Sequence, residues 1–207
     1  MVRFLISGVL LSSSLAVAQA PRDETLATGP FARMGMKYEK TFLGVDVARI
    51  DVQFDERTQE QFRALAQGRE YSDALGAKLA QVALGADNVL VQLRFLRNVS
   101  LGDYLDGARR NLTRARDAGL ISERGFAGSW QRVNEAFGRF EDRGFKEGDR
   151  ILYRARPGSL RTTVVAETGE VLLDVSVDDP EARASMLGGY FAPGSDFRKP
   201  LVRSLFR

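Results

Sequence analysis

The sequence predicts an α+β domain in which a long antiparallel sheet is covered on one face by a layer of helices. Apolar residues alternate with other residues, the spacing of half-buried strands, over 41–54, 89–95 and 151–175. Between these stretches, over 100–117 and 123–141, apolar residues recur every three or four positions, as they do on helices. Strands followed by helices, and then by strands and helices again, are typical of an antiparallel sheet with helices layered on it.

The first predicted strand covers 41–54 and contains an irregularity. An alternation of apolar residues runs through Val45 and Val47, but the next apolar residue, Ala48, follows directly. One inserted residue turns every later side chain to the other face of a sheet, so this slip predicts a β-bulge between Val47 and Ala48. Thr41 has the phase of Val45 and Val47, which places it on the face that the helices cover.

The elements that follow are predicted from spacing and from capping residues. Helical spacing covers 57–66 and 73–84, and a second strand covers 89–95. Ser100 is expected to cap a helix that runs to Asp117, because a serine side chain accepts a hydrogen bond from the first turn.

A further helix is expected over 123–141, with an aromatic stripe that we interpret as core. The stripe consists of Phe126, Trp130, Val133, Phe137 and Phe140. Residues 151–175 then predict a three-stranded antiparallel meander with short turns. Asp179 and Pro180 predict the start of a helix that ends near Tyr190, and a last helix is expected over about 200–206.

The amino terminus is typical of a secretory leader. Arg3 precedes an apolar run over 4–17, and Ala18-Gln19-Ala20 has the form that signal peptidase accepts. The sequence thus predicts a signal peptide over 1–20, cleavage after Ala20, a flexible lead-in over 21–32 and one domain over 33–207. We expect a periplasmic or secreted protein that does not span the membrane, with an uncleaved membrane anchor as the alternative.

Composition excludes several classes of chemistry. The chain has no cysteine and no histidine, which excludes Ser-His-Asp and Cys-His nucleophile systems and zinc sites built on those residues. No metal or other cofactor is expected. The net charge is +3 for the whole chain and +2 without the leader, which contains Arg3 and no acid. A charge this small, with arginines scattered among acids, gives no indication of a nucleic-acid partner.

One polar residue stands out on the helix that begins after Ser100. Asn111 lies on the apolar stripe of that helix, seven positions after Tyr104 and therefore almost directly below it. A buried asparagine has up to four hydrogen-bonding positions to satisfy. Either Asn111 bonds a neighbouring backbone carbonyl, or Tyr104 and Asn111 line a cavity that holds water or a ligand.

An ordered set of segments resembles the chalcone isomerase family, and in particular its bacterial, exported branch, from about residue 33 to the carboxyl terminus. These segments are Thr41-Phe-Leu-Gly-Val, Leu93-Arg-Phe-Leu-Arg-Asn-Val99, the helix with Tyr104 and Asn111, Phe145-Lys-Glu-Gly-Asp-Arg-Ile-Leu152, Met186-Leu and Leu201-Val-Arg-Ser-Leu205. The resemblance implies an open-faced sandwich, a long antiparallel sheet covered by helices with the ligand between the two layers.

The resemblance also implies site residues. The family's enzymes close a chalcone to a flavanone, with a threonine and a tyrosine polarising the ketone, an asparagine nearby and an arginine holding the anionic ligand. It places Thr41, Tyr104 and Asn111 at the first three positions and makes Arg33 the candidate for the arginine. The family's second threonine or serine has no counterpart, because that position falls near Arg183.

Three hypotheses for function remain open at this point. The first is a non-catalytic binder of a small apolar anion such as a fatty acid, with Arg33 or Arg97 facing the cavity and the aromatic stripe packing on the ligand. The arginine should then be matched either by an internal acid or by the ligand. Replacing it should weaken binding more than replacing Arg114 does. The second is an intramolecular lyase acting on an enone phenol, and the third is a structural or partner-binding protein.

Overall fold

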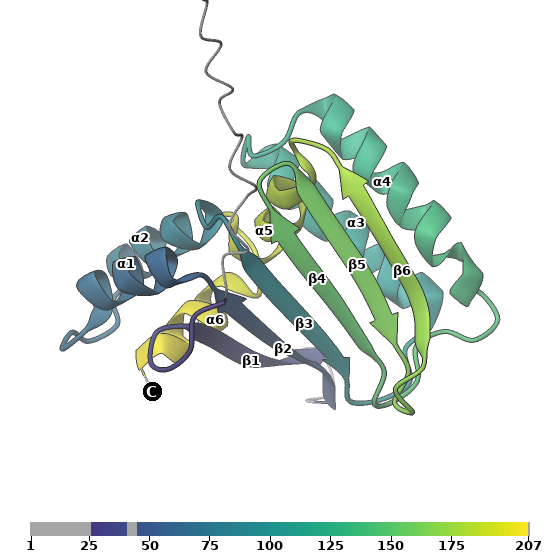
Figure 1. Cartoon of the computed structure of the whole chain (residues 1–207), viewed down its shortest axis with the longest axis horizontal. Coiled ribbons are helices and arrows are strands. Elements are labelled where there is room, and N and C mark those ends of the chain that lie inside the picture. The colour runs from purple at the N-terminus through teal and green to yellow at the C-terminus, as the bar shows by residue number, and fades with distance from the viewer. Residues whose placement is uncertain (1–25, 41–44, 207) are drawn as a thin grey trace, which may run out of the picture.

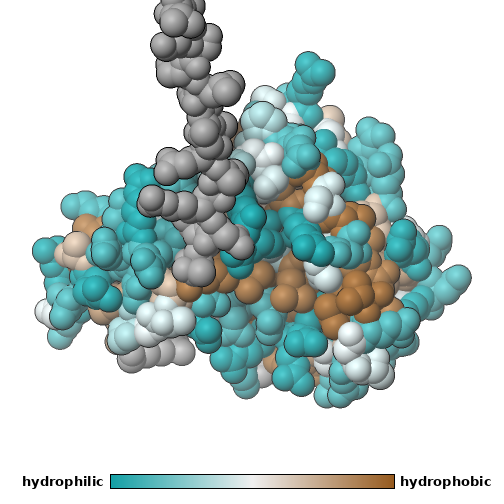
Figure 2. Space-filling view, viewed as in Figure 1, coloured by the Kyte–Doolittle hydropathy of each residue, from teal (hydrophilic) through white to brown (hydrophobic). Residues whose placement is uncertain are grey.

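The computed structural model describes residues 26–40 and 45–206. Six antiparallel strands form one sheet in sequential order, and the helices cover one of its faces (Figure 1). The opposite, open face is turned toward the viewer in Figures 1 and 2. The strands are β1 (Arg33–Lys40), β2 (Val45–Phe54), β3 (Val89–Phe95), β4 (Arg150–Arg156), β5 (Ser159–Val165) and β6 (Val171–Asp178). The helices are α1 (Glu56–Ala66), α2 (Asp73–Leu84), α3 (Leu101–Asp117), α4 (Glu123–Phe137), α5 (Ala182–Phe191) and α6 (Arg198–Arg203).

The predicted bulge lies in β2. Tyr38 of β1 pairs with Ala48, but the next residue of β1, Glu39, pairs with Asp46, so Val47 has no partner across this strand pair. The extra residue lets the adjacent side chains of Val47 and Ala48 both lie on the helix-covered side of the sheet. Beyond it the alternation is regular, and Ala48, Ile50, Val52 and Phe54 are all buried.

The segment just before β1 packs on the rest of the domain. Residues 26–32, expected as part of a flexible lead-in, pack against the sheet and α1. Ala27 is buried and donates its backbone N–H to the carbonyl of Phe54. The side chain of Gln59 donates to the carbonyls of Thr28 and Pro30. Strand β1 was also missed, because glycine and charged residues dilute the alternation of Met34, Met36 and Tyr38.

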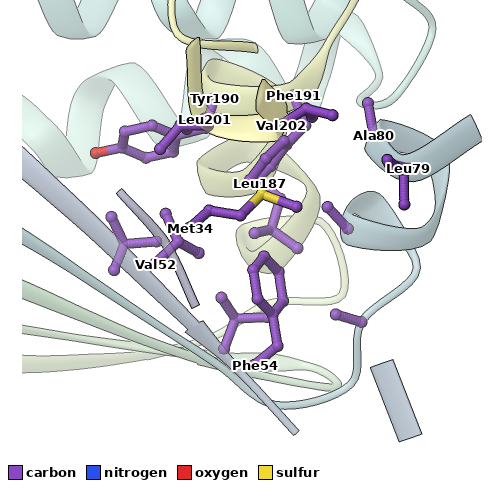
Figure 3. Packing of buried hydrophobic residues seen from close by; sticks show 14 of the residues in the cluster. Met34, Val52, Phe54, Leu79, Ala80, Leu187, Tyr190, Phe191, Leu201 and Val202 are labelled. Carbon is purple, nitrogen blue, oxygen red and sulfur yellow. The ribbon is translucent and has the colours of Figure 1, made fainter. Parts of the chain in front are cut away.

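The core lies between the sheet and the helices. One cluster joins β1–β3 to α1, α2, α5 and α6, with Phe54 against Phe62 and Phe191 at ring-centroid distances of 5.0 and 6.1 Å. Figure 3 shows Phe54, Met34 and Val52 of the sheet pointing toward residues of α5 and α6. A second cluster joins α3 and the end of α4 to β3–β6.

Two helix boundaries differ from the expectation. Helix α4 ends at Phe137 and the chain continues as a 3₁₀ turn over 138–140, in which the N–H of Glu141 donates to the carbonyl of Gly138. Asp179 does not cap α5 directly: its carboxylate accepts from the N–H of Glu181 at 2.7 Å and forms a turn, and the helix begins at Ala182.

Two buried aspartates fix loops at the ends of the sheet. Asp55, 3% exposed, accepts backbone N–H groups of Thr58, Asp87 and Asn88. Asp149, 1% exposed, pairs with both terminal nitrogens of Arg143. Burial by itself would raise the pKa of each carboxyl, but the donors around each carboxylate outweigh it and the pKa is lowered.

Candidate functional site

Two adjacent pockets, called below the smaller and the larger chamber of one cavity because they share five lining residues, lie between the sheet and helices α3, α4 and α5. The smaller chamber, about 140 Å³, is mainly apolar, with Val133, Phe137, Leu160 and Met186 among its lining. The larger one, about 290 Å³, has a mixed apolar and polar lining. Residues that line both chambers form the boundary between them. They are Tyr104, Ala108, Asn111, Tyr153 and Tyr190.

Helix α3 places Tyr104 and Asn111 at this boundary. Ser100 caps the helix as predicted, since its side chain accepts from the N–H of Asp103 at 3.1 Å. The cap fixes where the helix begins, and the seven-residue spacing then puts both side chains on the same side. The ring of Tyr104 packs on Phe137 and Phe145, each at 4.8 Å between ring centroids.

A pair of tyrosine hydroxyls joins α3 to the sheet. The hydroxyl oxygens of Tyr104 and of Tyr153 on β4 lie 2.5 Å apart. Burial raises the pKa of both phenols, and also that of Tyr190 on α5. All three are therefore neutral at physiological pH. One hydroxyl of the pair must donate to the other, which leaves one hydrogen for a carbonyl or carboxylate oxygen in the cavity.

Asn111 and Arg114 form the next polar group along α3. Arg114 donates to Asn111 Oδ1 at 3.4 Å and to Asp196 Oδ2 at 2.7 Å. Helix α5 comes close at this point because Gly189 has no side chain; a Cβ there would lie 2.9 Å from that of Asn111. Of the two sequence-based alternatives for Asn111, the structure supports a place in the cavity wall, where its Oδ1 accepts from the side chain of Arg114.

Charged side chains line the larger chamber. Arg97, just beyond β3, is exposed and lines this chamber, as do Arg110 and Arg114 of α3. Three acids also line it: Asp103, Asp106 and Asp196. The larger chamber can therefore hold the charged end of a ligand, and the smaller one an apolar tail.

The residues predicted as site residues are only partly brought together. Tyr104 and Asn111 lie on the same cavity, and Arg97 lines its larger chamber. Arg33 does not: it pairs with Gln53 in the sheet, and its exposed side chain lies on the open face, opposite to buried Met34. Thr41 lies outside the described residues.

Sequence reasoning missed three residues of the cavity. Tyr153 has the same phase in its strand as Ile151 and Ala155, and a tyrosine at such a position indicates a buried hydroxyl that needs a partner, but the sequence did not identify Tyr104 as that partner. Tyr190 lies near the end of the predicted last long helix and carried no such signal. Arg114 was treated as a neutral comparison, whereas it lines the larger chamber.

The smaller chamber has its own polar end. Ser129 of α4 and Ser185 of α5 are buried and hydrogen-bonded to each other at 3.0 Å. Arg132 donates to Ser129 and to Asp179. Among the residues that the structure describes, those of the cavity included, no group of three or more acidic residues is arranged to hold a metal ion. None of the described helices is both long and apolar enough to cross a membrane.

Comparison with known proteins establishes the fold. No family model matches the chain, and no curated protein matches its sequence. Among solved structures, the chain is similar to a fatty-acid binding protein of Arabidopsis thaliana, with a TM-score of 0.53 and 14% identity. The match covers 86% of this chain and 90% of the plant protein. The sheet order and the single helical layer thus confirm the predicted α+β architecture as a chalcone isomerase-like fold.

Proposed function

We propose that this chain is a non-catalytic binder of a small apolar anion such as a fatty acid. The observation that carries the proposal is the pairing of an apolar chamber with one whose lining includes arginine. The carboxylate would lie near Arg97 and Arg114 in the larger chamber, and the alkyl chain would extend past Tyr104 into the smaller one. The fatty-acid binding neighbour has the same fold, which supports this ligand class.

The volumes bear on how the ligand fits. Each chamber is below the ~300 Å³ at which pockets for drug-sized ligands begin, and the two together exceed it. A long ligand therefore has to occupy both. Tyr104 and Tyr153 stand between the chambers, so we expect the bound alkyl chain to shift the Tyr104 ring where it passes from one chamber to the other.

A binding titration tests the proposal. A long-chain fatty acid should bind saturably to the full chain, and the alcohol of the same length should bind more weakly because it lacks the carboxylate. Arg97→Gln should weaken binding of the acid by about tenfold, the size of one charge-assisted hydrogen bond. Arg124→Gln is the matched control. Arg124 is exposed on α4 and does not line the cavity, so this substitution removes the same charge at a distant position.

Filling the boundary provides a second variant. Ala108 lines both chambers, so Ala108→Phe should abolish binding of a long chain while a thermal melt shows that the protein still folds. The proposal is wrong if the acid and the alcohol bind equally, or if Ala108→Phe binds as wild type does. No saturable binding at all would favour a structural or partner-binding role.

An intramolecular lyase is a second candidate, favoured by Tyr104 and Asn111 lining one cavity. A neutral tyrosine hydroxyl can donate to a ketone oxygen and stabilise negative charge that develops there. Flavanone formation from a hydroxychalcone well above the uncatalysed rate, and lost in Tyr104→Phe, would establish the lyase in place of the binder.

We further propose that the chain is exported and that its mature form begins at Pro21. The support is the basic start, the apolar run and the cleavage site of the first twenty residues. Amino-terminal sequencing of protein from the host tests this; an intact Met1 on the mature product would contradict it.

A further inference from the structure

The open face of the sheet gathers positive charge. Residues paired across strands point to the same face, so the register assigns the side chains of this face. Among those that the structure describes, the cations are Arg33, Lys37, Arg49, Arg94, Arg150, Arg154, Arg156 and Arg161. The acids are Asp51, Asp174 and Asp178. The chain as a whole has a net charge of only +3, whereas the described side chains of this face include five more cations than acids, and one of these cations, Arg161, is paired with Asp174.

Four of these cations form an unbroken row across the sheet. Lys37 pairs with Arg49, Arg49 with Arg94, and Arg94 with Arg150. Like charges directly opposite each other destabilise a sheet. Asp51 pairs with Arg49 at 2.9 Å, but neither Arg94 nor Arg150 has a side-chain partner among the described residues. The fold therefore tolerates a repulsion that an external anion would relieve.

Apolar residues continue the same face toward the last strand. The row of cations leads on to Val165 and then to Val171, whose side chain is 58% exposed. Leu90 and Leu152 lie on this face and are half-buried. Figure 2 shows the result: apolar surface gathers over β4–β6, with hydrophilic surface around it.

We propose that this open face docks on the surface of an anionic phospholipid bilayer. Arginine guanidinium groups bind phosphate through paired hydrogen bonds. The exposed side chain of Val171 and the half-buried leucines on this face are stabilised when a bilayer removes them from water. The described residues of this face include no aromatic side chain on which a base could stack, which disfavours a single-stranded nucleic acid. Docking depends on these charges and is independent of what the cavity binds.

Vesicle partitioning tests the docking. The full-length chain is mixed with vesicles of phosphatidylcholine alone and of phosphatidylcholine with phosphatidylglycerol. Wild type should partition onto the anionic vesicles more strongly, and added salt should reduce the difference. Arg94→Gln with Arg150→Gln should lower partitioning onto anionic vesicles by about tenfold or more, given the usual gain per basic residue near such a surface.

The control removes the same charge elsewhere. Arg63→Gln with Arg124→Gln changes exposed helical arginines and should partition as wild type does. Every variant keeps the apolar leader, so any binding that the leader contributes is common to them. The Arg94 and Arg150 variant should also melt at the same temperature as wild type or higher, because it removes a repulsive pair; a purely structural role would lower it.

Three results would overturn the proposal. The first is equal partitioning of wild type onto neutral and anionic vesicles, and the second is an equal loss of partitioning in the two double variants. The third is tight, salt-dependent binding to a double-stranded oligonucleotide without binding to vesicles, which would make the partner a nucleic acid. Failure of docking would leave the fatty-acid titration unaffected, since Arg94 and Arg150 do not line the cavity.

Discussion

The tyrosine pair at the boundary of the two chambers gives the sharpest test of the site's structure. Tyr104→Phe and Tyr153→Phe each remove one hydroxyl and leave the other buried without its partner. Such an orphaned group costs ~1–3 kcal/mol. Because the pair borders a cavity, where water can reach the orphan, we expect about 1–2 kcal/mol for each single variant. In a protein of this size that lowers the melting temperature by about 2–8 °C.

The double variant decides the argument. With both hydroxyls gone no group is left unpaired, so Tyr104→Phe with Tyr153→Phe should be less destabilised than the sum of the single variants by ~1 kcal/mol or more. Urea denaturation of the four proteins, with thermal melts alongside, measures the coupling. Additivity within ~0.5 kcal/mol would show that the two hydroxyls do not interact and would refute the description of the boundary.

Two further changes follow from buried contacts. The pKa of Asp149 is lowered in the folded protein, so its contribution to stability is present above its unfolded value of about 3.9 and is lost as pH falls through the folded value. The free energy of unfolding should therefore fall less steeply toward acid pH in Asp149→Asn than in wild type. The same dependence on pH in both proteins would contradict this. Gly189→Ala should destabilise by ~1–3 kcal/mol, because the added methyl group would lie 2.9 Å from Asn111 Cβ where α5 meets α3. A denaturation midpoint equal to that of wild type would show that the helices move apart without cost.

Local signals in the sequence predicted much of the fold. Ser100 caps α3 where expected, because the serine acts within one turn of its own position. The bulge at Val47 was predicted from a single slip in alternation, since strand side chains have a strict period of two. Strand β1 was missed, because Gly35 and the charged residues of this strand dilute its alternation.

The candidate site and the basic face depend on contacts between distant segments. Tyr104 and Tyr153 are 49 positions apart, and only the packing of α3 on β4 brings their hydroxyls together. The row that contains Arg49, Arg94 and Arg150 exists only through strand register. Along the chain these arginines are far apart and acids lie between them, so the small net charge gave no indication that they form a row.

A chain-length series of saturated fatty acids tests the central claim most directly. If the acid end lies in the larger chamber and the chain extends into the smaller one, each added methylene should tighten binding until both chambers are full. The expected gain is ~0.8 kcal/mol, or about fourfold in affinity, per buried methylene. Beyond the filled length the affinity should stop rising, and Ala108→Phe should move this limit to shorter chains. Affinity that does not change with chain length, or a limit that Ala108→Phe leaves in place, would contradict the account.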